Sequence, residues 1–232
     1  MRQRHFVVRW LAVLALALQS VGALTQSATT VQTPLAETRQ KADHGDASAQ
    51  FALGVRYAFG LGVPQDVTQA VAWYRKAADQ GLASAQYNLG VRYADGQGVP
   101  QDVTQAVAWF RKAADQGDAD AQFNLGTMYN RGRGVAQDVT QAVAWFRKAA
   151  DQGDADAQFN LGAMYFKGEG VPQDHVEAHK WCNLAASRAT GNSQERYAAT
   201  RDATAKNMPP AQLAEAQKRV ADWQAAFEER QK

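Results

Sequence analysis

The sequence predicts an all-α protein, an α-solenoid of stacked helical hairpins with a C-terminal helical cap. The segment QDVTQAVAWFRKAADQG at residues 101–117 recurs unchanged at 137–153, and tryptophan recurs every thirty-six residues, at Trp73, Trp109, Trp145 and Trp181. Apolar residues within each unit follow the period of an α-helix. A hairpin of this kind cannot bury its own apolar face, so tandem copies are expected to stack into a solenoid.

The N-terminal residues have the layout of a secretory signal peptide. Three arginines precede an apolar run at residues 10–18, and small residues precede a cleavage point after Ala23. The run is far shorter than the roughly twenty residues needed to cross a bilayer. We therefore expect residues 1–23 to be removed, leaving a periplasmic or secreted protein with no membrane span.

Cleavage would change the charge of the chain. The full sequence has 25 Lys+Arg and 23 Asp+Glu, and residues 1–23 hold three arginines and no acid, so 25 − 3 = 22 basic residues remain and the net charge falls from +2 to −1. A near-neutral protein has no overall field that attracts nucleic acid, so we expect no nucleic-acid partner. A single cysteine, Cys182, excludes an intramolecular disulfide.

The tryptophan register sets the expected domain boundaries. Residues 24–44 contain an N-terminal segment and an entry half-repeat. Four repeats follow without insertion, at 45–80, 81–116, 117–152 and 153–188. Residues 189–232 lack the Leu-Gly pair and the Gly-x-Gly turn of the repeats, and predict capping helices that cover the exposed end of the stack.

The first helix of the first repeat is expected to run from Ala47 to Phe59. Ala49, Leu53 and Tyr57 recur at four-residue spacing and mark its packed face. Gly54 adjoins Leu53, where a residue without a side chain lets a neighbouring helix come close. A Gly-x-Gly sequence then ends the helix.

The second helix follows a turn. Pro64 prevents continuation of the first helix, and Asp66 offers an N-cap carboxylate. Gln69, three residues later, completes a capping-box pattern. The helix then carries Trp73 on its packed face and ends at Gly81.

The C-terminal cap is expected to contain two helices. Asn192, with Glu195 three residues later, predicts the start of one helix that ends near Asn207. A second helix follows the Pro-Pro pair, with an apolar face at a seven-residue spacing, carried by Leu213, Val220 and Phe227.

The repeat pattern resembles the Sel-1-like repeat, a relative of the tetratricopeptide repeat, over residues 45–188. The second repeat carries the pattern at Ala85, Gln86, Leu89, Gly90, Tyr93, Gly96, Gly98, Val99, Asp102, Ala106, Trp109, Phe110, Lys112, Ala113, Ala114 and Gly117. The resemblance implies a right-handed solenoid that binds other proteins, acting as a non-catalytic scaffold or adaptor of the bacterial envelope.

The resemblance also leaves an enzymatic alternative. A cysteine-rich minority of secreted relatives is associated with penicillin binding and β-lactamase activity, and those members pair two cysteines in each repeat. This chain has one cysteine in total. We therefore expect no enzyme, and we retain a β-lactam-binding or β-lactamase-like protein as the alternative.

Recognition is expected where the repeats differ. Helical geometry places positions 48, 52, 55 and 59, and their equivalents in later repeats, on one stripe of the first helix. The stripe reads Ser48, Ala52, Val55, Phe59; Ser84, Asn88, Val91, Asp95; Asp120, Asn124, Thr127, Arg131; and Asp156, Asn160, Ala163, Lys167. Stacking would align these residues into a groove with a ladder of amides that can bind an extended peptide. The predicted partner-binding residues are Phe59, Asn88, Asp95, Asn124, Arg131, Asn160 and Lys167. The alternative is that they are ordinary solvated positions.

One sequence pattern has metal-ligand spacing. His175, His179 and Cys182 lie at i, i+4 and i+7, and could ligate zinc or a soft metal. The first repeat has Val67, Val71 and Tyr74 at the same positions, which indicates packing instead. We predict no metal site and no cofactor, and no catalytic constellation is evident.

Overall fold

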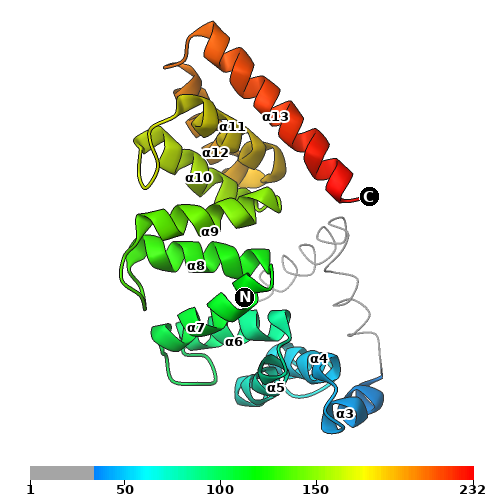
Figure 1. Ribbon diagram of the computed structural model, residues 1–232. Helices are drawn as coiled ribbons and strands as arrows, with labels where there is room; N and C mark the ends of the chain where they lie inside the picture. Colours follow the sequence, from blue (N-terminus) through cyan, green and yellow to red (C-terminus); the bar gives the residue numbers. More distant parts are fainter. Residues whose placement is uncertain (1–33) are drawn as a thin grey trace, which may run out of the picture. The chain divides into compact units, whose positions relative to one another are not determined.

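The computed structural model describes residues 34–232, which form helices joined by short turns with no strand among them (Figure 1). The predicted signal peptide at residues 1–23 lies outside these described residues. The chain divides into two compact units, and the boundary in the sequence lies between Gln80 and Gly81. The predicted all-α class is confirmed.

The described part of the first unit contains three helices, α3 (Leu35–Asp43), α4 (Ala47–Phe59) and α5 (Val67–Asp79). One cluster of its core contains Ala42, Ala49 and Leu53, with partly buried residues packed around them. Gln50 is buried and donates from Nε2 to the Ala42 carbonyl at 3.2 Å, which ties α4 to α3. Helix α4 has the bounds that the sequence predicts.

The second unit contains three helical hairpins followed by two further helices. The hairpins are formed by α6 with α7, α8 with α9 and α10 with α11, and each packs against the next. The bounds are α6 (Ala83–Asp95), α7 (Val103–Asp115), α8 (Ala119–Arg131), α9 (Val139–Asp151), α10 (Ala155–Lys167), α11 (His175–Arg188), α12 (Gly191–Ala205) and α13 (Pro210–Arg230). This arrangement is the predicted stack of helical hairpins.

Asp66 caps α5 as predicted, but the capping box forms only in part. Asp66 Oδ1 accepts from the Gln69 N–H at 3.0 Å. The Asp66 N–H donates to the carbonyl of Tyr57 at 2.9 Å, so it is already satisfied and has no need of the Gln69 side chain. The predicted second half of the box is therefore wrong, because a contact with the preceding helix replaces it.

The glycine after the buried leucine allows the two helices of a hairpin to approach closely. A Cβ atom on Gly54 would lie 2.6 Å from the Tyr74 ring, and one on Gly126 would lie 2.8 Å from the Phe146 ring. Both rings are buried on the second helix of the same hairpin. The predicted close approach is confirmed.

Glutamines form a further contact between the two helices of a hairpin, which the sequence reasoning did not identify. Gln116 donates from Nε2 to Gln86 Oε1 at 2.7 Å, and Gln152 does the same to Gln122 at 2.8 Å. This series of glutamine pairs ends at Gln158, whose buried Oε1 has no hydrogen-bond partner among residues 34–232. The reason is that the position thirty-six residues after Gln152 is Arg188.

Helices α12 and α13 form the predicted C-terminal cap. Helix α12 begins at Gly191 after Thr190, and no side chain caps it, so the predicted start at Asn192 is wrong. Helix α13 packs against α11. It buries Ala216 and Val220.

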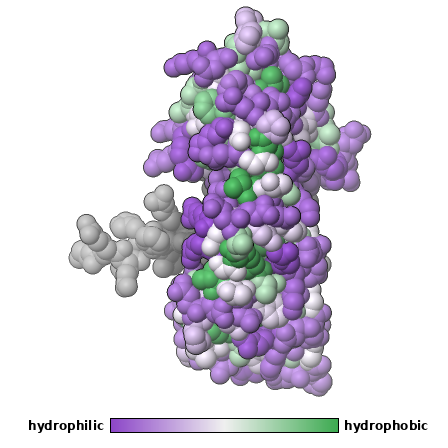
Figure 2. Space-filling view, turned by 60° about the vertical axis from the view of Figure 1, so that its left-hand side comes forward, coloured by the Kyte–Doolittle hydropathy of each residue, from purple (hydrophilic) through white to green (hydrophobic). Residues whose placement is uncertain are grey.

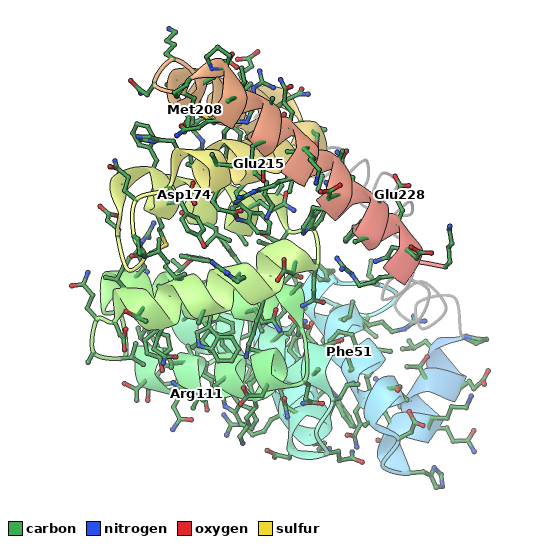
Figure 3. All side chains as sticks on the ribbon, turned by 45° about the horizontal axis from the view of Figure 1, so that its top comes forward. Phe51, Arg111, Asp174, Met208, Glu215 and Glu228 are labelled. Carbon is green, nitrogen blue, oxygen red and sulfur yellow. The ribbon has the colours of Figure 1, made fainter. Side chains whose placement is uncertain are left out.

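Aromatic and charged contacts attach α13. The Trp223 ring lies 6.3 Å from the Trp181 ring and stacks on Phe227 at 4.8 Å. Glu215 and Glu228 lie along this helix (Figure 3). Arg219, one turn after Glu215, bonds both Glu215 and Glu177 of α11 at 2.8 Å.

Candidate partner-binding site

The predicted amide ladder lies on α6, α8 and α10. Asn88, Asn124 and Asn160 are half-buried, and each donates from Nδ2 to the carbonyl four residues earlier, at 2.8, 3.0 and 2.8 Å. These bonds use part of the donor capacity that the sequence reasoning reserved for a partner. Each amide still has an Oδ1 acceptor, and Asn88 and Asn160 each have a second N–H, whereas Asn124 also hydrogen-bonds the Tyr87 hydroxyl.

The remaining predicted residues lie at the last turn of the first helices. Asp95, Arg131 and Lys167 are exposed at the ends of α6, α8 and α10. Lys167 Nζ lies 3.5 Å from Glu169 Oε1, a solvent-exposed ion pair of small energetic weight. Phe59 is in the first unit, where 61% of its surface is exposed. We call the twelve stripe positions of α6, α8 and α10 the variable face.

Carboxylates gather at the starts of α8 and α10. Asp118 and Asp154 are the N-caps, and they accept from the N–H groups three residues later at 2.8 and 2.6 Å. Asp120 and Asp156 follow two residues later, at the first stripe position. We call these four residues the acidic end of the variable face.

The acidic end has perturbed electrostatics. Burial raises the pKa of Asp118 and of Asp120. Burial, followed by the charges of Asp156 and Asp120, raises the pKa of Asp154 to about 6. An N-cap position alone would lower the pKa of a carboxyl group, because the helix N-terminus favours the ionised form. For Asp118 and Asp154, loss of hydration and repulsion between the carboxylates have the larger effect on the pKa.

Tyr87 brings a third helix into the same cluster. Burial, followed by the charges of Asp120, Asp118 and Asp154, raises the pKa of the Tyr87 hydroxyl to about 12, against the lowering effect of hydrogen bonding with the Asn124 side chain. Groups of α6, α8 and α10 therefore interact at one place. Perturbed groups gathered in this way are typical of functional sites.

The C-terminal cap closes one side of the acidic end. The Tyr197 hydroxyl of α12 donates to the Asp156 carboxylate, and its ring stacks on Phe159 at 4.3 Å. The Arg196 guanidinium lies 5.0 Å from the centre of the Phe159 ring. In the preceding hairpin the equivalent ring, Phe123, packs on a ring of the second helix at 5.8 Å. Helix α11 has the smaller Cys182 at that position, and Tyr197 supplies the missing ring.

Tyr87, Asp118, Asp154 and Tyr197 were missed by the sequence reasoning. A signal for two of them was available. The third and fourth repeats begin their first helix with Asp-Ala-Asp, at 118–120 and 154–156, where the second repeat has Leu-Ala-Ser. Tyr197 lies outside the repeat pattern and gave no signal.

The histidine and cysteine pattern lies on one helix but is not arranged as a metal site. Within residues 34–232, no three His, Cys, Asp or Glu side chains are placed to hold a metal ion. His179 and Cys182 are buried, and burial raises the pKa of the thiol to about 12. The His175 ring lies 5.5 Å from the ring of Phe166. These residues contribute to packing, as their alignment with Val67, Val71 and Tyr74 indicates.

Figure 2 shows a face of the protein that is mainly hydrophilic, with hydrophobic patches along its middle. Among residues 34–232, the exposed large hydrophobic side chains are Phe59 and Leu61, both in the first unit. Within the same residues, no helix combines the length and apolar character that crossing a membrane requires.

Comparisons with known proteins give one family. The family model described as Sel1 repeat matches residues 47–82, 83–118, 119–154 and 155–189. The comparison with curated proteins gives no significant match.

Solved structures with the same repeat are similar to the chain. A protective antigen of uropathogenic Escherichia coli strains, which displays an SLR fold, is 47% identical with a TM-score of 0.67, over 68% of this chain and 34% of that one. This chain thus spans about a third of that protein. A Sel1 repeat protein from Oxalobacter formigenes is 32% identical with a TM-score of 0.62, over 80% of this chain and 81% of that one.

Proposed function

Since the chain belongs to the Sel1 repeat family, we propose that it is a non-catalytic scaffold that binds a protein or peptide segment on the variable face of α6, α8 and α10. Sel1 repeat proteins are generally protein-interaction scaffolds, and their helical fold is generally non-enzymatic. The variable face, together with α11, is where the hairpins of the second unit depart from their shared repeat.

The proposal rests on a difference between the two helices of a hairpin: the second helix packs the stack, and the first helix carries the side chains that vary. The helices α7 and α9 have the same sequence, and both bury the Ala, Val and Phe side chains that pack the stack. The variable face instead differs from repeat to repeat at three of its four positions and presents amides, acids and bases. Asn88, Asn124 and Asn160 repeat at the fourth position and use Nδ2 for bonds within their own helices, so that their Oδ1 atoms can accept from the backbone N–H groups of an extended peptide.

We further propose that the protein works in the periplasm or outside the cell. Residues 1–23 have the layout of an export signal, which supports this location. Solved proteins that are similar to the chain come from bacteria. The E. coli protein is a protective antigen, and a secreted or surface location for this chain would be in keeping with that description.

The test is affinity capture from an envelope extract with the mature chain and two triple variants. Asn88→Ala, Asn124→Ala and Asn160→Ala together remove the amides of the variable face. The matched control removes three exposed amides with the same spacing from the second helices, by substitution of Gln69, Gln105 and Gln141 with alanine. We expect the first variant to lose a captured protein that the control retains. Equal capture by both variants would contradict the proposal.

The non-catalytic part of the proposal has its own test. The cysteine-rich relatives that suggest a β-lactamase pair two cysteines in each repeat, whereas Cys182 is buried and stands alone in this chain. We expect the purified mature protein to hydrolyse nitrocefin no faster than a heat-inactivated sample. Turnover well above that control would favour the enzymatic alternative.

A further inference from the structure

Resting on the proposed function, we infer that the partner segment is extended and alternates in charge, with basic side chains toward the acidic end of the variable face and acidic side chains toward its basic end. The acidic end is formed by Asp118, Asp120, Asp154 and Asp156. The basic end is formed by Arg131 and Lys167, at the last turn of the same two helices.

The two ends face a segment that crosses α8 and α10. Asp120 and Arg131 are eleven residues apart on one helix, which corresponds to about 16 Å along its axis. Asn124 and Asn160 lie between the two ends and can bond the backbone of such a segment. Successive side chains of an extended segment point to opposite sides, so one side can meet the acids and the other the bases.

The chain does not neutralise its own acidic end. None of the four carboxylates forms an ion pair with a basic side chain of residues 34–232. Asp118 and Asp154 accept from helix N–H groups, and Asp156 accepts from Tyr197. Elsewhere in the same unit the half-buried Glu177 carboxylate is paired, since it bonds both Lys180 and Arg219.

The unpaired charges make the acidic end a site that a cation would stabilise. The pKa values of Asp118, Asp120 and Asp154 are raised by loss of hydration, and those of Asp118 and Asp154 also by neighbouring carboxylates. A guanidinium or ammonium group would relieve both effects and could also contact the Tyr87 ring. A metal ion is a poorer occupant, because no three of these ligands are placed to hold one among the described residues.

The C-terminal cap provides an internal example of this recognition. Beside the acidic end, Arg196 lies over the Phe159 ring while the neighbouring Tyr197 hydroxyl bonds Asp156. One arginine and one hydroxyl donor are thus already placed on an aromatic ring and a carboxylate of α10. Tyr87, Asp118 and Asp120 also combine an aromatic ring with carboxylates. No arginine or lysine side chain of residues 34–232 forms an ion pair with these two carboxylates.

The test uses two labelled peptides of equal length, composition and net charge, (Lys-Glu)4 and (Lys-Lys-Glu-Glu)2. In the first, an extended backbone places every lysine on one side and every glutamate on the other. In the second, each side carries both charges. We expect the mature chain to bind (Lys-Glu)4 at least about fivefold more tightly by fluorescence anisotropy, with the difference shrinking as salt is raised. Equal affinity, or no binding of either peptide, would overturn the inference.

Two triple variants assign the effect to the acidic end. Asp118→Asn, Asp120→Asn and Asp154→Asn together remove three charges but keep the caps, because Asn and Asp are equally good N-cap residues. The control changes Asp102, Asp115 and Asp138, which are exposed on or before the second helices, to Asn. We expect the first variant to lose the preference for (Lys-Glu)4 and the control to retain it. A preference that survives in the first variant would also overturn the inference.

The outcomes separate the inference from the proposed function. If capture of an envelope protein depends on Asn88, Asn124 and Asn160 while the peptides bind equally, the proposed function stands and the inference fails. If capture does not depend on those amides, the proposed function itself fails.

Discussion

The substitution Asp154→Asn is expected to stabilise the protein at neutral pH. Asp154 caps α10 by accepting from the Ala157 N–H at 2.6 Å, and asparagine can make the same bond. The substitution therefore removes one negative charge from the acidic end and leaves the cap in place. Asp120 and Asp156, whose charges act on Asp154, are unchanged.

The magnitude follows from the shift in pKa. Burial and the neighbouring carboxylates raise the pKa of Asp154 from 3.8 to about 6. At about 1.4 kcal/mol per pKa unit, this corresponds to a penalty of at most about 3 kcal/mol on the ionised form. Solvent on the accessible side of the carboxylate screens part of it, so we expect the variant to gain about 1–2 kcal/mol in free energy of unfolding at pH 7.

The gain has a defined pH dependence. Because the pKa is higher in the folded state, the folded protein binds the proton more tightly, and the wild type loses stability as the pH rises from about 4 through about 6. Below this window the carboxyl group is protonated in both states and the penalty is absent. The advantage of Asp154→Asn should therefore be present at pH 7 and vanish near pH 4.

Urea unfolding followed by circular dichroism at a series of pH values measures this difference. Asp138→Asn is the matched control, since Asp138 caps α9 in the same way from an exposed position, and it should change stability by only a few tenths of a kcal/mol. A variant that is less stable than the wild type at pH 7, or equally favoured at pH 4 and pH 7, would refute the reasoning about the acidic end.

Three further outcomes are expected. Gly126→Ala should lower the free energy of unfolding by about 1–3 kcal/mol in urea titrations, because its Cβ would meet the buried ring of Phe146 at 2.8 Å; an unchanged midpoint would contradict this close packing. Tyr197→Phe should lower it by about 1–2 kcal/mol, because it removes the bond to Asp156 but keeps the stacked ring, and an equal effect in an Asp156→Ala background, which has no acceptor at that position, would show that another contact is responsible. Cys182 should resist a thiol reagent at pH 8 in the folded protein and react in denaturant, because the thiol is buried and its pKa is raised to about 12; rapid reaction of the folded protein would exclude that burial.

The sequence was sufficient for the helices because their signals are local. Helix α4 begins after Asp46, whose side chain accepts from the Ala49 N–H, and it ends at Gly60, which has a φ of 69°. Both signals can be recognised from residue type alone. The capping box of Asp66 failed because its N–H finds the Tyr57 carbonyl, a contact that depends on how two helices meet.

The candidate site could be predicted only in part. Helical angle placed Asn88, Asn124 and Asn160 on one stripe, but it gave no sign that each amide bonds the carbonyl one turn earlier. The cluster formed by the acidic end and Tyr87 depends on side chains of three helices that approach only in the folded stack. Tyr87 therefore could not be assigned to the same cluster as Asp154 from the sequence.

Site-specific photo-crosslinking tests the central claim, that the variable face binds the partner. A photoreactive amino acid is placed at Thr127 or Ala163 on the variable face, and at Ala108 or Ala144 as controls that are exposed on the second helices α7 and α9. Each variant is irradiated in an envelope extract, and crosslinked products are detected by mass spectrometry. We expect one shared partner to be crosslinked from Thr127 and Ala163 and to be absent from the controls. A partner crosslinked from Ala108 and Ala144 but not from the variable face would contradict it.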